Sequence, residues 1–350
     1  MTIYFVATTV SDFDSYRNYY PPTDNATLDP YGNTRVYFPS ATAGFSTAQK
    51  DFNTVVTGTL WLGFFFNGTY WSGSGADWSL AYDIEDSFIG FLDGEGNPVL
   101  KIGNNPNVSL PFQIRVYLRD GSVVDLTDLP DPYPTNTGTN DKWDIKVQPG
   151  VGFSIYFNRS LYYTYSGDLG NSATTTNGIG RISLGTGDNS AGCYLSSILC
   201  ADFDTRFARI SNITLSTTPS VDTSSATLGV AITTYTSGDN IVNYDENQYT
   251  AFDAVGEKII FPENDTVTLE DGQVIAGVVT SYRAIETGSS PVTTLTPVLE
   301  IASTEYTGTG IPLTTSRKVH QQTFATNPAT SSAWQPSDLE GIGYGLIMNT

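Results

Sequence analysis

The sequence predicts an all-β protein built from two sandwich domains. Glycine is abundant at 33 residues, aromatic residues make up 13% of the chain and charged residues only 15%, which is typical of short strands joined by turns. Apolar and polar residues alternate in segments about ten residues apart, which is the spacing of strands in a sandwich. No segment keeps a helical period for more than about two turns, except near the end of the chain.

Between residues 34 and 215, the alternation predicts a series of strands. Turn chemistry separates them, as in the glycine-containing runs 93–97 and 120–121. The predicted strands are 34–38, 57–66, 88–92, 99–102, 112–118, 122–126, 143–147, 153–157, 161–165 and 207–215. This order and spacing indicate a sandwich of two sheets.

The clearest of these strands lie in the middle of the chain. Trp143, Ile145 and Val147 alternate with charged or polar residues, which places one face on a core and the other in water. The segment 153–157 alternates in the same way, and Pro149-Gly150 supplies the turn between the two strands. We therefore expect two successive strands, each with one buried face.

This pattern of a tryptophan, alternating apolar positions, a short turn and a second alternating strand resembles the late strands of laminin G and concanavalin A-like domains. The segment 202–215, which contains Ile210-Ser211 and Ile213, resembles the last strand of that family, which returns beside the first strand. The resemblance covers residues 34–216 and implies a concanavalin-like jelly-roll sandwich. It also implies the binding of glycans or proteins, which is more common in that family than cleavage.

Composition predicts where one domain ends and the next begins. The run that follows the first sandwich is rich in serine and threonine, and Val221 is its one large apolar residue, which is typical of a linker. The second, smaller β-sandwich is predicted to have strands at 229–235, 258–261, 274–283 and 294–301. Ser337 is a candidate N-cap for a short helical turn before the last strand. The predicted organisation is an N-terminal strand and arm at 1–33, the concanavalin-like sandwich at 34–216, a linker at 217–227 and a C-terminal sandwich at 228–350.

The second half resembles a β-sandwich module of bacteriophage virion proteins. The matching residues are the run Asn-Pro-Ala-Thr-Ser-Ser-Ala-Trp at 327–334, Leu339 and the terminal strand 343–346. The opening Met-Thr-Ile-Tyr is similar to the start of several phage structural proteins. The resemblance implies a structural component of a tailed-phage particle, a capsid or tail decoration protein that is not an enzyme. It also implies other virion proteins as partners and a homo-oligomer, with a trimer expected from the symmetry of virion appendages.

Charge and hydropathy restrict the partners and the location. There are 36 acidic residues against 16 basic ones, without a cluster of lysine and arginine, so nucleic acid is not a predicted partner. Residues 1–10 lack the basic region of a secretory signal, and the most apolar stretch, 60–66, is too short to span a bilayer. We therefore expect no membrane insertion, synthesis in the host cytoplasm without a signal peptide, and a final location in the virion.

Few residues of this chain suit catalysis. His320 is the single histidine and lies in a polar run, so a surface or interface position is predicted rather than a catalytic triad or a zinc site. Asp83 and Glu85 share one face of an extended segment, but they do not match the Glu-x-Asp-x-x-Glu signature of the family's glycoside hydrolases. A glycan-degrading depolymerase on the same fold is the alternative to a binding protein. Cys193 and Cys200 are predicted to be buried free thiols, with a disulfide across a hairpin as the alternative.

Aromatic residues near turns are the candidate glycan contacts. There, a ring face can stack on a sugar while asparagine or aspartate supplies hydrogen bonds. Tyrosine and tryptophan on sandwich strands also serve as core or subunit contacts, which is the alternative for each of them. The candidates are Tyr70, Trp71, Tyr162, Tyr163 and Tyr165.

Calcium is the one cofactor that the sequence leaves open. Laminin G-like domains often hold one oxygen-ligated ion at the rim, and acidic loops are plentiful in this chain. The candidate ligands are Asp202 and Asp204, or Asp188 and Asn189, and neither pair has the ordered spacing of an EF-hand loop.

Overall fold

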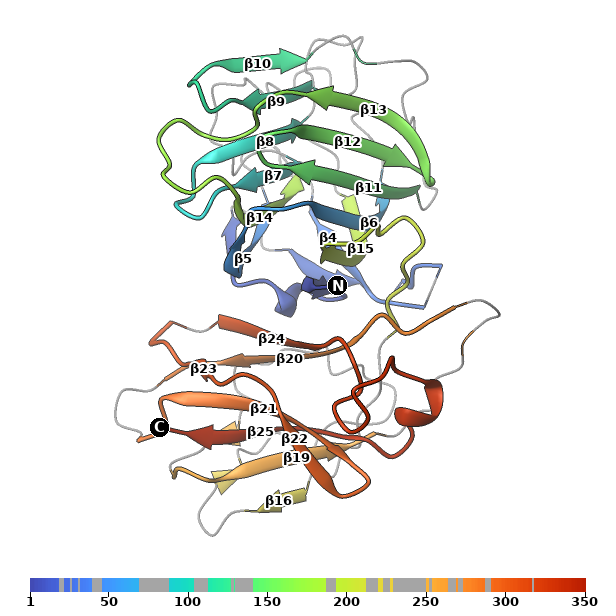
Figure 1. Cartoon of the computed structure of the whole chain (residues 1–350), viewed down its shortest axis with the longest axis vertical. Helices are drawn as coiled ribbons and strands as arrows, with labels where there is room; N and C mark the ends of the chain where they lie inside the picture. The colour runs from blue at the N-terminus through green and yellow to red at the C-terminus, as the bar shows by residue number, and fades with distance from the viewer. Residues whose placement is uncertain are drawn as a thin grey trace. The chain divides into compact units, whose positions relative to one another are not determined.

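The computed structural model describes most of the chain, in segments that all the structural statements below concern. These segments are 1–18, 22–25, 27–30, 32–39, 46–68, 88–103, 113–126, 129, 141–186, 193–211, 220–222, 227–228, 250–251, 254–263, 269, 273–286, 291–316 and 318–350. The chain divides into two compact units, Met1–Ser211 and Asn212–Thr350 (Figure 1). Nearly all of the regular structure is strand, which confirms the predicted all-β fold.

Unit 1 contains two antiparallel sheets. The eight-stranded sheet has the order β13-β12-β11-β6-β15-β4-β3, with β1 beside β15. Its strands are β1 (Ile3–Ala7), β3 (Thr23–Asn25), β4 (Arg35–Phe38), β6 (Leu60–Gly68), β11 (Asp141–Gln148), β12 (Gly152–Phe157), β13 (Ser160–Ser166) and β15 (Cys193–Ala201). The N-terminal strand, which the sequence assigned to a separate arm, is therefore part of this sheet.

The seven-stranded sheet of unit 1 has the order β10-β9-β8-β7-β14-β5-β2. Its strands are β2 (Ser15–Asn18), β5 (Ser46–Val56), β7 (Ile89–Leu92), β8 (Pro98–Gly103), β9 (Gln113–Tyr117), β10 (Val123–Leu126) and β14 (Ile179–Thr186). The strands of both sheets carry the blue to yellow-green colours of unit 1 in Figure 1.

The inward faces of the two sheets form one hydrophobic core. Trp143, Ile145 and Val147 point inward from β11, as predicted, and are fully buried. The Trp143 ring lies 5.7 Å from the ring of Phe88, which directly precedes β7 in the other sheet. Burying a side chain of this kind contributes about 1.5–3 kcal/mol, so this aromatic contact helps to hold the two sheets together.

The strand that closes the eight-stranded sheet is not the predicted one. Residues 202–211 contain no strand, so the predicted closing strand at 207–215 is wrong in its described part. β15 instead lies beside β1. A β-bulge in β15, where Ser197 has a φ of 49°, changes the spacing of the core residues Leu195 and Ile198 from two to three. This bulge breaks the period of two and hides the strand from the sequence pattern.

Unit 2 contains a six-stranded sheet of order β16-β19-β25-β21-β22, with β23 beside β21, and two two-stranded sheets, β17-β18 and β20-β24. Its strands are β16 (Ser220–Asp222), β17 (Thr227–Leu228), β18 (Thr250–Ala251), β19 (Lys258–Pro262), β20 (Val278–Ala284), β21 (Thr294–Ile301), β22 (Thr304–Thr307), β23 (Ile311–Pro312), β24 (Lys318–Phe324) and β25 (Gly343–Asn349). β16 lies within the segment 217–227 that was predicted as a linker. Val221 pairs with Ile259 of β19, so this part of the segment belongs to the sheet. The predicted strand at 229–235 lies outside the described residues.

The run 327–334 of unit 2 is a turn that positions Trp334. The Asn327 amide donates to the Ser332 carbonyl over 2.9 Å, and the side-chain oxygen of Asn327 accepts a hydrogen bond from the amide two residues further on. Trp334 is buried, and its Nε1–H donates to the Phe324 carbonyl over 2.7 Å. The run that resembles the virion module therefore has a structural role in holding a core tryptophan.

Helical structure in the described part of the chain is limited to the 3-10 turns η1 (Val10–Asp12) and η4 (Pro336–Asp338). η4 is the short helical turn predicted before the last strand. Ser337 lies inside this turn and Gln335 precedes it, so the prediction of Ser337 as the N-cap is wrong. Pro336 explains the difference, because its fixed φ suits the first helical position. Within the described segments, no helix is long and apolar enough to cross a membrane.

Candidate functional site

The segment 202–211, here called the closing segment, packs on the outer face of the eight-stranded sheet. Its Thr205 is fully buried, and the Oγ1 hydroxyl donates to Asp144 Oδ1 over 2.7 Å. Asp144 of β11 lies opposite Gly63 of β6. A Cβ atom at Gly63 would lie only 2.6, 2.7 and 2.8 Å from Asp144 Oδ1, Lys142 Nζ and Thr205 Oγ1. Glycine at this position therefore leaves the space in which Thr205 is held.

A buried ion pair lies beside Thr205. Lys142 Nζ is 3.3 Å from Asp144 Oδ1, and both side chains are at least nine-tenths buried. Burial lowers the pKa of Lys142 and raises the pKa of Asp144, while each partner's charge opposes the shift of the other. Because the pair has almost no access to solvent, we assign it a structural role, namely to hold Thr205.

The next residue of the closing segment, Arg206, lies on an aromatic pair. Trp61 of β6 and Tyr156 of β12 stack with ring centroids 5.5 Å apart and an interplanar angle of 29°. Arg206 Cζ lies 4.6 Å from the Tyr156 centroid and 5.6 Å from the Trp61 centroid, where the negative ring faces attract the cation. Asp204 fixes the guanidinium, accepting hydrogen bonds from Nε at 2.9 Å and from Nη2 at 2.5 Å.

Two further cations and an exposed ring extend this surface. Arg159, in the turn between β12 and β13, places Cζ 5.0 Å from the ring centroid of Phe207, which is 68% exposed. Lys146 Nζ lies 5.9 Å from the centroid of Trp61, its cross-strand partner. Within the described segments, neither Lys146 nor Arg159 forms an ion pair with a carboxylate. Together these residues form what we call the cation–aromatic patch: Trp61, Lys146, Tyr156, Arg159, Arg206 and Phe207.

The patch carries a net positive charge at neutral pH. Burial opposes the ionisation of Asp204, but the hydrogen bonds and the charge of Arg206 outweigh it and lower the pKa of Asp204 below its ordinary value. The hydrogen bonds to Asp204 in turn raise the pKa of Arg206. Arg206 and Asp204 therefore neutralise each other, and the charges of Lys146 and Arg159 remain.

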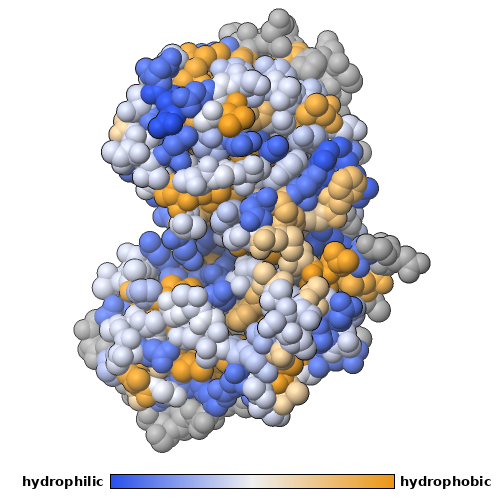
Figure 2. Space-filling model, in the orientation of Figure 1, coloured by the Kyte–Doolittle hydropathy of each residue, from blue (hydrophilic) through white to orange (hydrophobic). Residues whose placement is uncertain are grey.

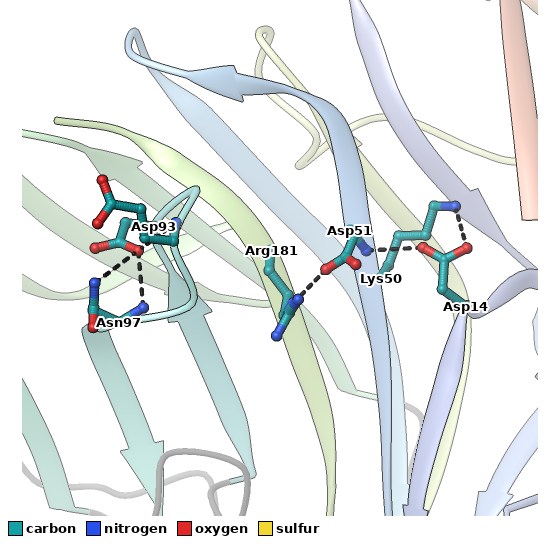
Figure 3. Close-up of polar contacts among 7 residues, drawn as sticks. Asp14, Lys50, Asp51, Asp93, Asn97 and Arg181 are labelled. Atoms are coloured by element: carbon teal, nitrogen blue, oxygen red, sulfur yellow. Dashed lines mark hydrogen bonds and ion pairs between the residues drawn. The ribbon is translucent and has the colours of Figure 1, made fainter. Parts of the chain in front are cut away.

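Two other cations of unit 1 form ion pairs with carboxylates, and one of them, Lys50, also lies 5.7 Å from the centroid of the Phe5 ring. Arg181 of β14 forms an ion pair with Asp51 of β5, as Figure 3 shows. Lys50 Nζ lies 3.1 Å from Asp14 Oδ1, and the Asp51 amide donates to Asp14 Oδ2 over 2.9 Å (Figure 3). These contacts fasten β5 to its neighbours and leave the charges balanced.

Exposed apolar side chains on unit 1 are scattered. On the face of the molecule in Figure 2, apolar residues form small separate groups among polar ones. The large apolar side chains that are exposed in the described segments of unit 1 are Met1, Leu28, Val123, Val151, Leu161 and Phe207. Phe207 is the aromatic member of this set, and it lies in the patch.

The structure places the predicted tyrosines of β13 against the core. Tyr162, Tyr163 and Tyr165 are partly buried and pack on the core of unit 1. The Tyr165 ring lies 5.7 Å from that of Phe153, and the Tyr162 ring lies 4.7 Å from that of Phe157. None of the three belongs to the cation–aromatic patch. The other predicted contacts, Tyr70 and Trp71, lie outside the described residues, as do Asp83 and Glu85.

The predicted calcium ligands have protein partners. Asp202 Oδ1 accepts a hydrogen bond from the Thr2 amide over 2.7 Å, and Asp204 binds Arg206. Asp188 and Asn189 lie outside the described residues. Elsewhere in the segments that the structure describes, no three histidine, cysteine, aspartate or glutamate side chains lie close enough together to hold a metal ion.

The histidine and the cysteines are buried. His320 is only 5% exposed, and its ring lies 5.5 Å from that of Tyr282, its partner across β20 and β24. The predicted surface position of His320 is therefore wrong, because the imidazole packs on a neighbouring ring. Cys193 and Cys200 are free and buried, as predicted, and burial raises the pKa of both thiols.

Sequence reasoning missed the patch because its residues come from distant parts of the chain. Trp61 and Tyr156 occupy outward positions of predicted strands, which the alternation assigns to solvent. Arg206 and Phe207 belong to the segment that was predicted to enter the sheet. The usable signal was the presence of large aromatic residues at outward positions, where polar residues are expected.

Comparison with known proteins gives no family for this chain. No family model matches it, and no curated protein matches its sequence. Among solved structures, it is similar to the cellulose induced protein Cip1, with a TM-score of 0.36, 16% identity and coverage of 56% of this chain and 90% of that chain. The T. cruzi calreticulin globular domain has a TM-score of 0.37, 10% identity and coverage of 58% and 90%. Alginate lyase Aly36B has a TM-score of 0.32, 12% identity and coverage of 55% and 88%. All three TM-scores are below 0.5, and we draw no conclusion about this chain from them.

Proposed function

We propose that unit 1 binds a glycan through the cation–aromatic patch, and that the chain is a binding component of a tailed-phage particle rather than an enzyme. The observation that carries glycan binding is the exposed ring of Phe207, with Arg159 and Arg206 at 5.0 and 5.8 Å from its centroid. An aromatic ring can stack on the C–H face of a sugar, while guanidinium N–H groups donate hydrogen bonds to its oxygen atoms. The patch offers both kinds of contact within one small area.

The distribution of apolar surface also favours a small polar ligand over a protein partner at this patch. A protein interface of standard size has an apolar centre and buries about 800 Å² on each partner. In the described segments of unit 1, Leu161 is the one large exposed aliphatic side chain paired with a patch residue, Tyr156, and the ring of Phe207 has guanidinium groups beside it. A sugar needs only one or two rings and a few donors.

The virion setting rests on the resemblance of residues 327–346 to phage structural modules. In this setting the protein is a capsid or tail appendage made in the host cytoplasm, with other virion proteins as its partners. We propose that the protein is a homo-oligomer, namely a trimer. Its symmetry would repeat the patch around one axis. When several copies of a weak glycan site bind at once, the overall affinity rises by roughly 10²–10⁴. Light scattering tests this part, because a stable monomer at high concentration contradicts it.

Glycan binding is tested with a glycan array, followed by calorimetric titration of the sugars that bind. Phe207→Ala should weaken binding about tenfold, which is the effect of losing one stacking contact of about 1.4 kcal/mol. Val123→Ala is the matched control, because Val123 is 49% exposed in the same unit but lies on β10 of the seven-stranded sheet, outside the patch. Unchanged affinity in Phe207→Ala, or the absence of any bound glycan, contradicts the proposal.

An incubation with the sugars that bind distinguishes a binding protein from an enzyme that cleaves them. A depolymerase on this fold is the alternative function, and its candidate carboxylates Asp83 and Glu85 lie outside the described residues. Each sugar that binds is incubated with the protein, and new reducing ends are measured over time. Products that accumulate with many turnovers per chain would replace the binding role by an enzymatic one.

A further inference from the structure

We infer that the ligand of the cation–aromatic patch is an acidic polysaccharide, whose carboxylate groups bind Arg159 and Lys146. This inference rests on the proposed glycan binding and specifies its chemistry. The chain has 36 acidic residues and only 16 basic ones, yet the patch gathers three cations around its rings. Of the three, Arg206 alone is bound to a carboxylate of the described residues.

Arg159 is the strongest indication. It occupies the second position of the two-residue turn between β12 and β13, where Asn158 has a φ of 45° and Arg159 a φ of 73°. Turns with positive φ at both positions strongly favour asparagine followed by glycine. A side chain at the second position costs free energy relative to glycine, and strain of this kind is often found at functional sites. The turn thus presents a guanidinium at a conformational cost.

The surroundings of Arg159 leave its donors available. Its guanidinium contacts the face of Phe207, and no carboxylate of the described segments lies within ion-pair distance. A ring face attracts the cation but accepts none of its five N–H groups as a carboxylate would. The same holds for Lys146, whose ammonium lies over Trp61.

Carboxylated sugar fits this arrangement better than nucleic acid. A guanidinium presents two parallel N–H donors that match the two oxygens of a carboxylate. A sugar acid combines that group with a ring whose C–H face can stack on Phe207. A nucleic acid carries a much denser charge and needs an extended basic surface, whereas this chain has a net charge of -20.

The test compares acidic oligosaccharides with neutral ones of the same length and linkage. The probes are oligomers of galacturonate, glucuronate, mannuronate and guluronate, each with its carboxyl-reduced counterpart, together with a sulfated oligosaccharide and single-stranded DNA. We expect at least one uronate oligomer to bind about tenfold more tightly than its reduced form. The difference should shrink in high salt, because salt screens the charges. Equal affinity for acidic and reduced forms overturns the inference and leaves glycan binding intact, whereas the absence of binding to every sugar defeats both. Preference for the sulfated sugar or for DNA also overturns it.

Variants of the turn separate a ligand contact from a structural role. Arg159→Gly relieves the positive φ and should raise the midpoint of thermal unfolding, yet it should reduce the preference for uronate about tenfold. Arg159→Gln keeps the strain and should lose the same preference. Arg181→Gln is the control, because Arg181 is paired with Asp51 outside the patch, and it should keep the preference. A stabilised Arg159→Gly variant that binds uronate like the wild type would show that Arg159 does not contact the ligand.

Discussion

Unit 1 holds its cations in two different ways. In the seven-stranded sheet, Arg181 and Arg115 face carboxylates on neighbouring strands, Asp51 and Asp125. On the outer face of the eight-stranded sheet, Arg159 and Lys146 instead lie on aromatic rings, with no carboxylate of the described residues in ion-pair distance. A carboxylate uses the N–H donors of a guanidinium, whereas a ring holds the cation and leaves the donors for a ligand. The comparison indicates that one residue type fastens strands in one sheet and is available for recognition beside the other.

The largest effect is expected where a charge pair is buried. Asp144→Ala leaves the ammonium of Lys142 in the interior without its partner and should cost about 3–5 kcal/mol. Asp125→Ala is the matched variant at the more exposed pair with Arg115 and should cost about 1 kcal/mol or less. Urea denaturation of the two variants measures the difference. Similar losses would mean that the pair on β11 is not isolated from water.

A smaller effect is expected where the closing segment is seated. In Gly63→Ala the added methyl group collides with the side chains around Thr205, which should cost about 1–3 kcal/mol. Glycan affinity should fall with it, because Arg206 is carried by the same segment. Gly58→Ala is the control, since no atom lies within 4 Å of a Cβ there. If Gly63→Ala unfolds at the same urea concentration as the wild type, Thr205 is not held as described.

The smallest effect concerns the partly buried carboxylate of Asp24. Burial raises the pKa of Asp24 to about 6, a hydrogen bond from the Val10 amide opposes this shift, and the charge of Asp12 adds to it. The folded state therefore holds this proton more tightly than the unfolded state, whose pKa is near 3.8. Ionised Asp24 costs stability above pH 6, and the cost disappears as the pH falls from about 6 to about 4.

Asp24→Asn should thus stabilise the protein by about 1–2 kcal/mol at pH 8 and by almost nothing at pH 4, after allowance for partial exposure. Asp14→Asn, at the carboxylate paired with Lys50, should instead destabilise the protein at pH 8. Denaturation curves at the two pH values test both variants. A loss of stability in Asp24→Asn at pH 8 would show that the carboxylate is favourably bound.

The strands that could be predicted are those with large apolar residues at a clean period of two. β21 was predicted with its observed bounds, 294–301, and β11 and β12 within two residues. β5 escaped because Ala48, one of its core residues, is small, and because a neighbouring position is a buried lysine, Lys50. β15 escaped because its bulge interrupts the period. In both strands, contacts with distant residues allow a sequence that departs from the alternation of apolar and polar residues.

Of the candidate site, the local pattern shows only the large aromatic residues at outward positions of strands. The site depends on the gap at Gly63, which accepts Thr205 from a segment about 140 residues further along the chain. This contact helps to bring Arg206 over Trp61 and Phe207 beside Arg159. A closing strand at 207–215, as the sequence suggested, would have placed Phe207 in a sheet instead of on a surface with Arg159.

The central claim is that the ligand meets the cations that lie on rings and pair with no carboxylate of the described residues, and not the carboxylate-bound cations. The most direct test is NMR of the arginine Nε–H groups during titration with the uronate oligomer that binds best. Our account predicts that the signal of Arg159 moves with the bound fraction, while those of Arg181 and Arg115 stay in place. Shifts at Arg181 or Arg115 without a shift at Arg159, in a sample shown to be saturated with ligand, would contradict it.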